Sequence, residues 1–200
     1  MSLSEAKSLG AVGSILVLLT AVPSVGWILG IIGFVMTLVA IKQISEAVND
    51  RKIYGNMITS VILAIGAIAV GTAAVIGTVL RVMGMGSFVG PDFIPGPNIG
   101  VGDWIGLGVA IFAGLVVVWG LLIASAVFLR RSYNAIAARL NVKMFETAAL
   151  LYLIGAVTAI IGVGFLLLFV ADILLAVAFL SIQEPKAPET SPAQAVPVPK

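Results

Sequence analysis

Six long apolar stretches, separated by Pro, Gly and short charged segments, constrain this chain more than any of its other features. They cover residues 9–22, 26–44, 56–80, 104–129, 147–162 and 165–182. A helix needs about 20 residues, within a range of roughly 17–25, to cross the hydrocarbon core of a bilayer. The third, fourth and sixth stretches reach that range, whereas the first and the fifth are borderline in length.

The composition indicates that lipid, and not water, surrounds these stretches. Hydrophobic residues make up 60% of the 200 residues and charged residues only 10%, whereas a soluble domain has about 25% charged residues. So few charges cannot cover a surface that faces water. The sequence therefore predicts an all-α integral membrane bundle of about six transmembrane helices. In the alternative, the first two and last two stretches form re-entrant hairpins, and four helices or fewer cross.

The distribution of Lys and Arg predicts the orientation in the membrane. If the connecting segments alternate between the two sides, ten of the eleven Lys and Arg residues lie on one side and Arg81 lies alone on the other. Cytoplasmic segments carry such an excess of basic residues. We therefore expect a plasma-membrane protein with both termini cytoplasmic and an external Gly- and Pro-rich loop at 82–103. Residues 1–183 form one membrane domain, followed by a Pro-rich, disordered cytoplasmic tail at 184–200.

The residue types that are absent argue against most enzyme classes. The chain has no Cys and no His, which excludes thiolate nucleophiles, imidazole bases and the usual zinc, haem and iron–sulfur ligands. Because the acids also form no cluster, we expect no catalytic residue, no cofactor and no metal site. A net charge of +2 without a basic, aromatic face gives no reason to expect nucleic acid.

Asp172 is the sharpest candidate for a functional residue. It lies near the middle of the last apolar stretch, where a charged side chain costs roughly 2.5–3.5 kcal/mol on insertion scales. The carboxyl group must therefore be neutral, paired or turned to a watered interior. A neutral acid bonded to another helix and a site that responds to protons or cations are both compatible with this position. The polar partners that the sequence offers are Tyr152, Thr158, Ser125 and Thr37.

Two further sets of residues indicate packing and lipid contacts. Small residues let membrane helices approach closely, which makes packing candidates of Gly26, Gly30, Gly33, Gly71, Gly106 and Gly155. The segment 130–146 places Tyr133 and Ile136 on one face of an extension of the fourth helix, expected to lie on the membrane surface. Its basic residues are candidate contacts for anionic lipid headgroups: Arg130, Arg131, Arg139 and Lys143. In the alternative, these charges only set the topology.

Two patterns in the sequence resemble a known family. They are "AKSLGAVGSILVLL" followed by "PSVGWILGIIGFVMTLVAIKQISE", and "RRSYNAIAARLNVKMFETAALLYLIGAVTAIIGVGFLLLFVADILLAVAFLSI". Together they cover most of residues 3–183. They resemble the archaeal and bacterial membrane family catalogued as domain of unknown function 996. The resemblance implies a small multi-pass membrane protein of archaeal source and supplies no functional residue.

Two function hypotheses follow for a bundle with so few polar residues inside it. The first is a non-enzymatic accessory subunit or scaffold, which packs in the bilayer as a homo-oligomer or within a larger membrane complex. The second is a transporter or channel for a small ion or solute that uses Asp172.

Overall fold

The computed structural model describes residues 3–82 and 101–183, and all regular structure in these two ranges is helical. The six α-helices are α1 (Leu3–Leu18), α2 (Gly26–Ala47), α3 (Arg51–Val82), α4 (Val101–Leu140), α5 (Met144–Thr158) and α6 (Val163–Leu180). Short 3-10 turns, η1 (Leu19–Ala21) and η2 (Ala159–Ile161), follow α1 and α5. The predicted all-α fold is confirmed.

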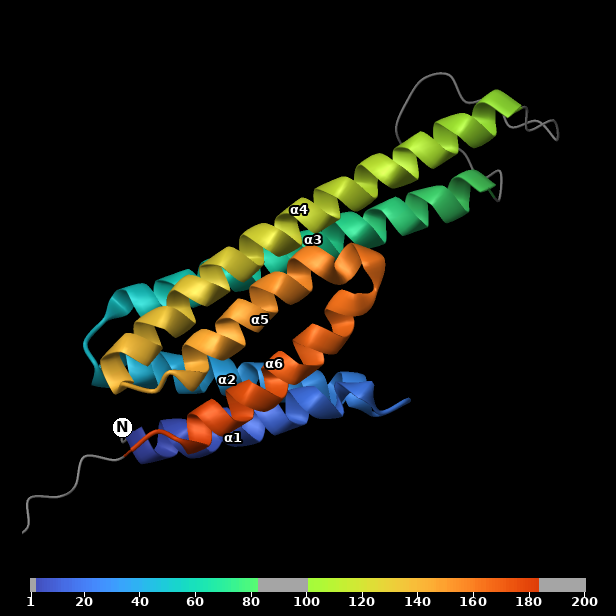
Figure 1. The fold of residues 1–200 in the computed structure, drawn as a ribbon. Helices are drawn as coiled ribbons and strands as arrows, with labels where there is room; N and C mark the ends of the chain where they lie inside the picture. The colour runs from blue at the N-terminus through green and yellow to red at the C-terminus, as the bar shows by residue number, and fades with distance from the viewer. Residues whose placement is uncertain (1–2, 83–100, 184–200) are drawn as a thin grey trace, which may run out of the picture.

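The six helices form a closed ring. Each helix packs against the next one in the chain, and α6 returns to pack against α1. The contact between α2 and α3 is the lightest in the ring. Figure 1 shows the long α3–α4 pair above, the α5–α6 pair in the middle and the α1–α2 pair below. Near the labelled N-terminus, the ends of α1 and α6 lie side by side.

The helices differ greatly in length, and this difference shapes the molecule. α3 has 32 residues and α4 has 40, whereas α1, α2, α5 and α6 have 16, 22, 15 and 18. The α3–α4 pair therefore extends well beyond the turns that end the other two pairs (Figure 1). We call residues 68–82 of α3 and 101–118 of α4 the arm, and the α1–α2 and α5–α6 pairs the short hairpins.

The apolar helices agree with a membrane protein. Four segments are long and apolar enough to cross a bilayer: Gly26–Ala47, Arg51–Leu80, Gly108–Leu140 and Met144–Ile161. The apolar segment Gly164–Leu180 of α6 is shorter. Large apolar side chains are exposed along every helix, as expected of a surface that meets lipid. The predicted helical membrane bundle is confirmed.

The connections lie close to the positions that Pro and Gly indicated. The first short hairpin turns at residues 19–25, which include Pro23, and the second turns at Gly162, whose φ of 81° suits a glycine. The predicted external loop at 82–103 is shorter, because α3 includes Val82 and α4 begins at Val101. Its remaining residues, 83–100, and the predicted disordered tail, 184–200, lie outside the described residues.

One expectation about the segment 130–146 needs correction. The segment does extend α4, up to Leu140, but its apolar face does not lie on the membrane surface. Tyr133 is only 2% exposed, and Ile136 is fully buried. The reason is that α5 and α6 fold back beside this end of α4 and bring Phe145 and Phe179 into the same apolar cluster.

Candidate functional site

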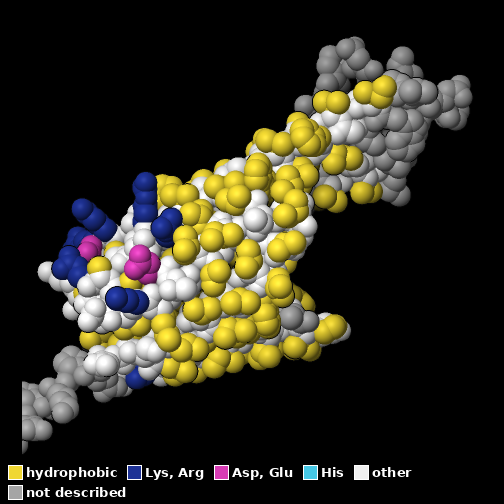
Figure 2. Space-filling view, viewed as in Figure 1, with side chains coloured by type: hydrophobic (Ala, Val, Ile, Leu, Met, Phe, Trp, Pro, Cys, Tyr) yellow, Lys and Arg dark blue, Asp and Glu magenta, His cyan; other side chains and the backbone are white. Residues whose placement is uncertain are grey.

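Most of the buried side chains gather at the charged end of the bundle. Figure 2 shows Lys and Arg side chains at that end, with an apolar surface over the rest of the visible face. We call the cluster of large buried side chains there the head. Its largest members are Ile41, Ile44, Ile53, Tyr133, Ile136, Phe145, Phe179 and Ile182. The rings of Phe145 and Phe179 meet edge to face with centroids 5.1 Å apart, an arrangement that aromatic pairs favour.

Polar contacts between distant parts of the chain reinforce the head. The Ser132 hydroxyl donates a buried 2.8 Å hydrogen bond to the carbonyl of Ile53, which joins α4 to α3. The Lys7 ammonium donates to the carbonyl of Ile182 at 3.0 Å and so closes the ring between α1 and the end of α6. Arg139 forms a 3.0 Å ion pair with Asp50. The head is therefore held by directional contacts as well as by apolar packing.

Asp172 lies on α6 and is half-buried. Tyr133 of α4, a helix on the other side of α5 in the ring, is buried. Tyr152, a predicted partner, stacks near Tyr133 with ring centroids 6.4 Å apart. The other three predicted partners donate to backbone carbonyls: Thr158 to Ile154, Ser125 to Ser60 and Thr37 to Gly33.

Sequence reasoning missed the burial of Tyr133 in the head. It placed Tyr133 in a segment on the membrane surface, at a different depth from Asp172. The signal that could have found it is the spacing of Tyr133 and Ile136 on an otherwise continuous helix, which also fits a buried face. In the structure α4 continues through this position to Leu140, and the phenol is buried in the head.

The glycines of the short hairpins lie at close contacts. A Cβ added at Gly33 would meet the Gly13 carbonyl oxygen at 2.5 Å, so α1 and α2 cross there backbone to backbone. Gly155 and Gly164 form the corresponding crossing of α5 and α6. Gly26 and Gly30 pack against Thr20 beside the turn. Every glycine in these four helices has another part of the chain within 4 Å of an added Cβ.

The glycines of α3 and α4 differ from those of the short hairpins. Gly71 meets Val118, and Gly114 meets Ala74, along the contact between the two helices. Six other described glycines of α3 and α4 have nothing within 4 Å of an added Cβ. Gly106, a predicted packing residue, is one of them. The six are Gly55, Gly66, Gly77, Gly106, Gly108 and Gly120.

An apolar hollow lies on the α3–α4 pair where the arm begins. Its volume is about 420 Å³, and α3 supplies most of its lining, including Ala67, Gly71 and Val75, with Val118 and Leu122 from α4. Thr72 is the single residue with a polar side chain in this lining. Such a surface suits hydrocarbon. In residues 3–82 and 101–183, no three His, Cys, Asp or Glu side chains gather where they could hold a metal ion.

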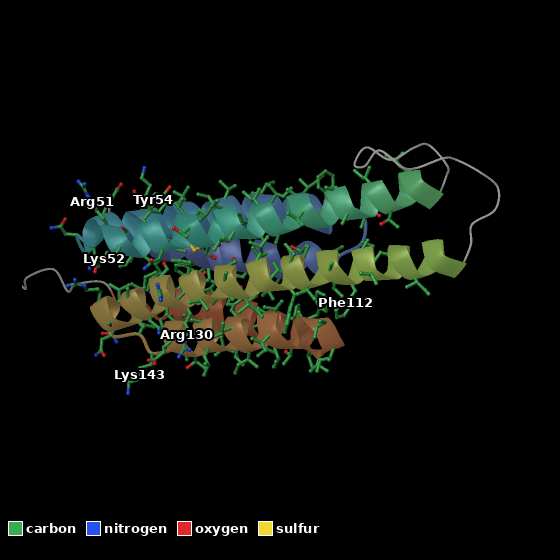
Figure 3. All side chains as sticks on the ribbon, turned by 90° about the horizontal axis from the view of Figure 1, so that it is seen from above. Arg51, Lys52, Tyr54, Phe112, Arg130 and Lys143 are labelled. Carbon is green, nitrogen blue, oxygen red and sulfur yellow. The ribbon has the colours of Figure 1, made fainter. Side chains whose placement is uncertain are left out.

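The basic side chains predicted to meet lipid headgroups fall into two groups. Arg139 is occupied by its ion pair with Asp50. Arg130, Arg131 and Lys143 form no ion pair within the described parts of the chain. The buried Nε of Arg130 lacks a hydrogen-bond partner, and the Arg131 guanidinium lies over the ring of Phe128 at 5.4 Å. Figure 3 shows Arg130 and Lys143 at the charged end, far from Phe112 on the arm.

Comparison with known proteins places the chain in a family of unknown function. Residues 29–173 match the family described as "Protein of unknown function (DUF996)". The chain is 32% identical, over 184 residues, to "Uncharacterized protein MJ1644" of Methanocaldococcus jannaschii. That similarity covers 92% of this chain and 95% of the relative. No solved structure matches the chain.

Proposed function

The chain belongs to the DUF996 family of proteins of unknown function, and we propose that it is a non-enzymatic accessory subunit or scaffold of the plasma membrane. In this role it packs through its arm against a second copy of itself or against another membrane protein. The head stabilises the fold of the single chain. The outer parts of α3 and α4, including the arm, carry the assembly surface.

The observation that carries this proposal is the set of open glycines on α3 and α4. A glycine inside a helix costs about 0.5–1 kcal/mol relative to alanine. The glycines of the short hairpins offset this cost by allowing close helix crossings within the chain. Those of α3 and α4 allow no such crossing within the described chain, whereas contacts between membrane helices are rich in small residues.

One face of α3 carries three small residues and a valine in a line. Gly66, Val70, Ala73 and Gly77 follow one another at helical spacing. This face is turned by about 100° around the helix from the face of Ala67, Gly71 and Ala74 that contacts α4. We call it the glycine face of α3. Ala73 and Gly77 are exposed and Gly66 is half-exposed, so a second helix has access to it.

The experiment compares assembly in native membranes. The full chain and a Gly66→Leu/Gly77→Leu variant are tagged, extracted in a mild detergent and examined by native mass spectrometry. We expect the unaltered chain to appear as a homo-oligomer or with a second membrane protein, and the variant to appear as a monomer. Because both positions face open space, the variant should keep its fold.

The matched control adds bulk on the nearly opposite side of α3, as Val75→Phe/Val79→Phe. Both of these valines are exposed. The control should assemble like the unaltered chain. A monomeric unaltered chain would remove the basis of the proposal, as would equal loss of assembly in the two variants.

The charged head faces the cytoplasm in this proposal, with both termini on that side. The support is the gathering of Lys and Arg at one end of the bundle (Figure 2). Arg130, Arg131 and Lys143 are the proposed contacts to anionic headgroups, each contributing about 1 kcal/mol near the surface. Replacing these three with Gln should weaken retention of phosphatidylglycerol in native mass spectra. Arg139→Gln should change it little, because Arg139 is already paired with Asp50.

A second candidate function is transport of a small ion or solute through the ring. The observation that favours it is the half-buried position of Asp172 near the middle of α6. An Asp172→Asn variant keeps the size of the side chain and removes its charge. Loss of proton or cation flux in proteoliposomes with this variant is the expected result. Unchanged flux, or no flux with the unaltered chain, would exclude this candidate.

A further inference from the structure

We propose that the two short hairpins are re-entrant. They enter the bilayer from the side of the charged head, turn inside the hydrocarbon of the far leaflet and return. Only α3 and α4 then cross the whole bilayer, and lipid chains fill the space beyond the two turns. This arrangement stands whether or not the arm assembles with another protein.

The level of the second turn is fixed by Trp119 of α4. Its indole N–H donates hydrogen bonds to the carbonyls of Ala156 and Val157, at 3.1 and 3.2 Å. The last turn of α5 therefore lies beside Trp119. From Trp119, α4 runs outward for another 14 residues to Ile105, which is about 21 Å at about 1.5 Å per residue.

The surface of α4 beyond this level is apolar and exposed. Residues 105–118 carry no charge, and Ile105 and Phe112 are 64% and 65% exposed. If the turn of α5–α6 lay at the far water surface, this whole length would stand in water. Soluble surfaces rarely expose contiguous apolar patches of that extent. The hydrocarbon must therefore continue past the turn.

The lengths counted from the charged end lead to the same conclusion. From Lys42 to Gly26, α2 covers about 24 Å, and the 18 residues of α6 cover about 27 Å. The hydrocarbon core is about 30 Å thick, so both lengths, counted from the charged end, are shorter than its full thickness. From Arg130 to Ile105, α4 covers about 38 Å, which is sufficient even when the helix is tilted.

Both turns are built to tolerate hydrocarbon. Neither residues 19–25 nor residues 159–162 include a charge. Several amides at the turns have acceptors nearby: Val22 donates to Leu19, Gly26 to Val22 and Gly162 to Ala159. Backbone donors left without acceptors would be costly in lipid. Large apolar side chains flank both turns and are exposed: Val25, Trp27, Ile161 and Phe165.

The apolar hollow on α3–α4 lies at the level of the turns. Val118 and Leu122, which help to line it, are neighbours of Trp119 on α4. Ala67, at its inner end, is the last buried residue of α3 before the arm. Because its lining is almost wholly apolar and continuous with the exposed arm, we assign a lipid hydrocarbon chain as its occupant.

Spin labels on single cysteines test the depth of the turns, since the chain has no cysteine of its own. The labelled full-chain variants are Val25→Cys and Ile161→Cys in the hairpin turns and Ala138→Cys at the charged end. All three side chains are exposed, so the labels should leave the packing intact. Each variant is reconstituted in phosphatidylcholine vesicles, and the accessibility of the label to oxygen and to a water-soluble nickel chelate is measured.

We expect the turn labels to lose most of the nickel-chelate accessibility seen at Ala138 and to gain accessibility to oxygen, which partitions into hydrocarbon. Nickel-chelate accessibility at either turn equal to that at Ala138 would overturn the proposal for that hairpin. A monodisperse elution profile confirms that each labelled chain is folded. The assembly experiment on Gly66 and Gly77 measures the oligomeric state and not the depth of the turns, so either proposal can fail without the other.

Discussion

The head and the arm are made of similar residues but are packed in opposite ways. In the head, aromatic and β-branched side chains from several helices bury one another, and a hydroxyl joins α3 to α4. In the arm, two helices contact each other along one seam, and large apolar side chains point outward. The head is therefore complete within one chain, whereas the surface of the arm is completed by its surroundings.

This difference teaches that apolar character alone does not identify the core of a membrane protein. Phe112 on the arm and Phe179 in the head both belong to long apolar helical stretches, yet one is exposed and the other fully buried. The same holds for glycine, which forms a crossing at Gly33 and meets nothing at Gly77. Two pairs of substitutions compare the head with the arm in energy, and two further predictions measure polar contacts outside the arm.

The largest effect is expected from truncating a head aromatic. Phe179→Ala removes the ring that packs on Gly10 and Phe145, and truncation of a buried Phe costs about 3–5 kcal/mol. Phe112→Ala on the arm should stay within about 0.5 kcal/mol, as for other exposed positions. Thermal unfolding in detergent measures both variants. Similar losses of stability in the two would break the distinction between head and arm.

A matched pair of glycine substitutions comes next. Gly33→Ala forces a methyl group against the backbone of Gly13, and such overpacking costs typically about 1–3 kcal/mol. Gly77→Ala meets open space and should raise stability by about 0.5–1 kcal/mol through the better helix propensity of alanine. The melting temperatures of the two variants should therefore move in opposite directions. For the monomeric chain, a fall with Gly77→Ala would show that Gly77 is packed within the chain.

A smaller effect is expected from a buried hydroxyl. Ser132→Ala removes the hydrogen bond to the Ile53 carbonyl that joins α4 to α3, at a cost of about 0.5–1.5 kcal/mol. Thr59 donates to Gly55 of its own helix at an exposed position, so Thr59→Ala should have less effect. Chemical unfolding in mixed micelles can compare the two. The prediction is contradicted if Thr59→Ala is the more destabilising.

The smallest effect belongs to the ion pair of Arg139 and Asp50. The Arg139 side chain is 56% exposed and that of Asp50 is 17% exposed, and pairs near the surface contribute about 0.2–1 kcal/mol. A double-mutant cycle with Arg139→Ala and Asp50→Ala should give a coupling energy in that range that declines as salt is added. A coupling that does not depend on salt would show that the head shields this pair from water.

The sequence was sufficient to predict the helical membrane bundle and the places where the chain turns. Length, apolarity and the positions of Pro23 and Gly162 carry this information, because a membrane leaves few alternatives to helices. Among the predicted packing glycines, Gly33 and Gly155 lie at close crossings, whereas Gly106 meets open space. Sequence alone could not separate these cases, because it does not say which face of a helix its neighbours cover.

The burial of Tyr133 was harder to predict for a related reason. Depth in the membrane was inferred from charge, and the arginines at 130 and 131 placed Tyr133 outside the bundle. In the structure the helix passes this position without interruption, and α5 and α6 pack around it. The position of Tyr133 therefore depends on contacts between segments far apart in the chain, which periodicity within one segment does not report.

Cysteine cross-linking in native membranes tests most directly whether the glycine face of α3 is the surface that another protein completes. Gly77→Cys lies on this face, and Val75→Cys lies on a nearly opposite side of the same exposed helix. With benzophenone maleimide on the cysteine, irradiation of Gly77→Cys should form a covalent product with a second copy or with another membrane protein, and Val75→Cys should not. No product from Gly77→Cys, or equal products from both variants, would contradict the account.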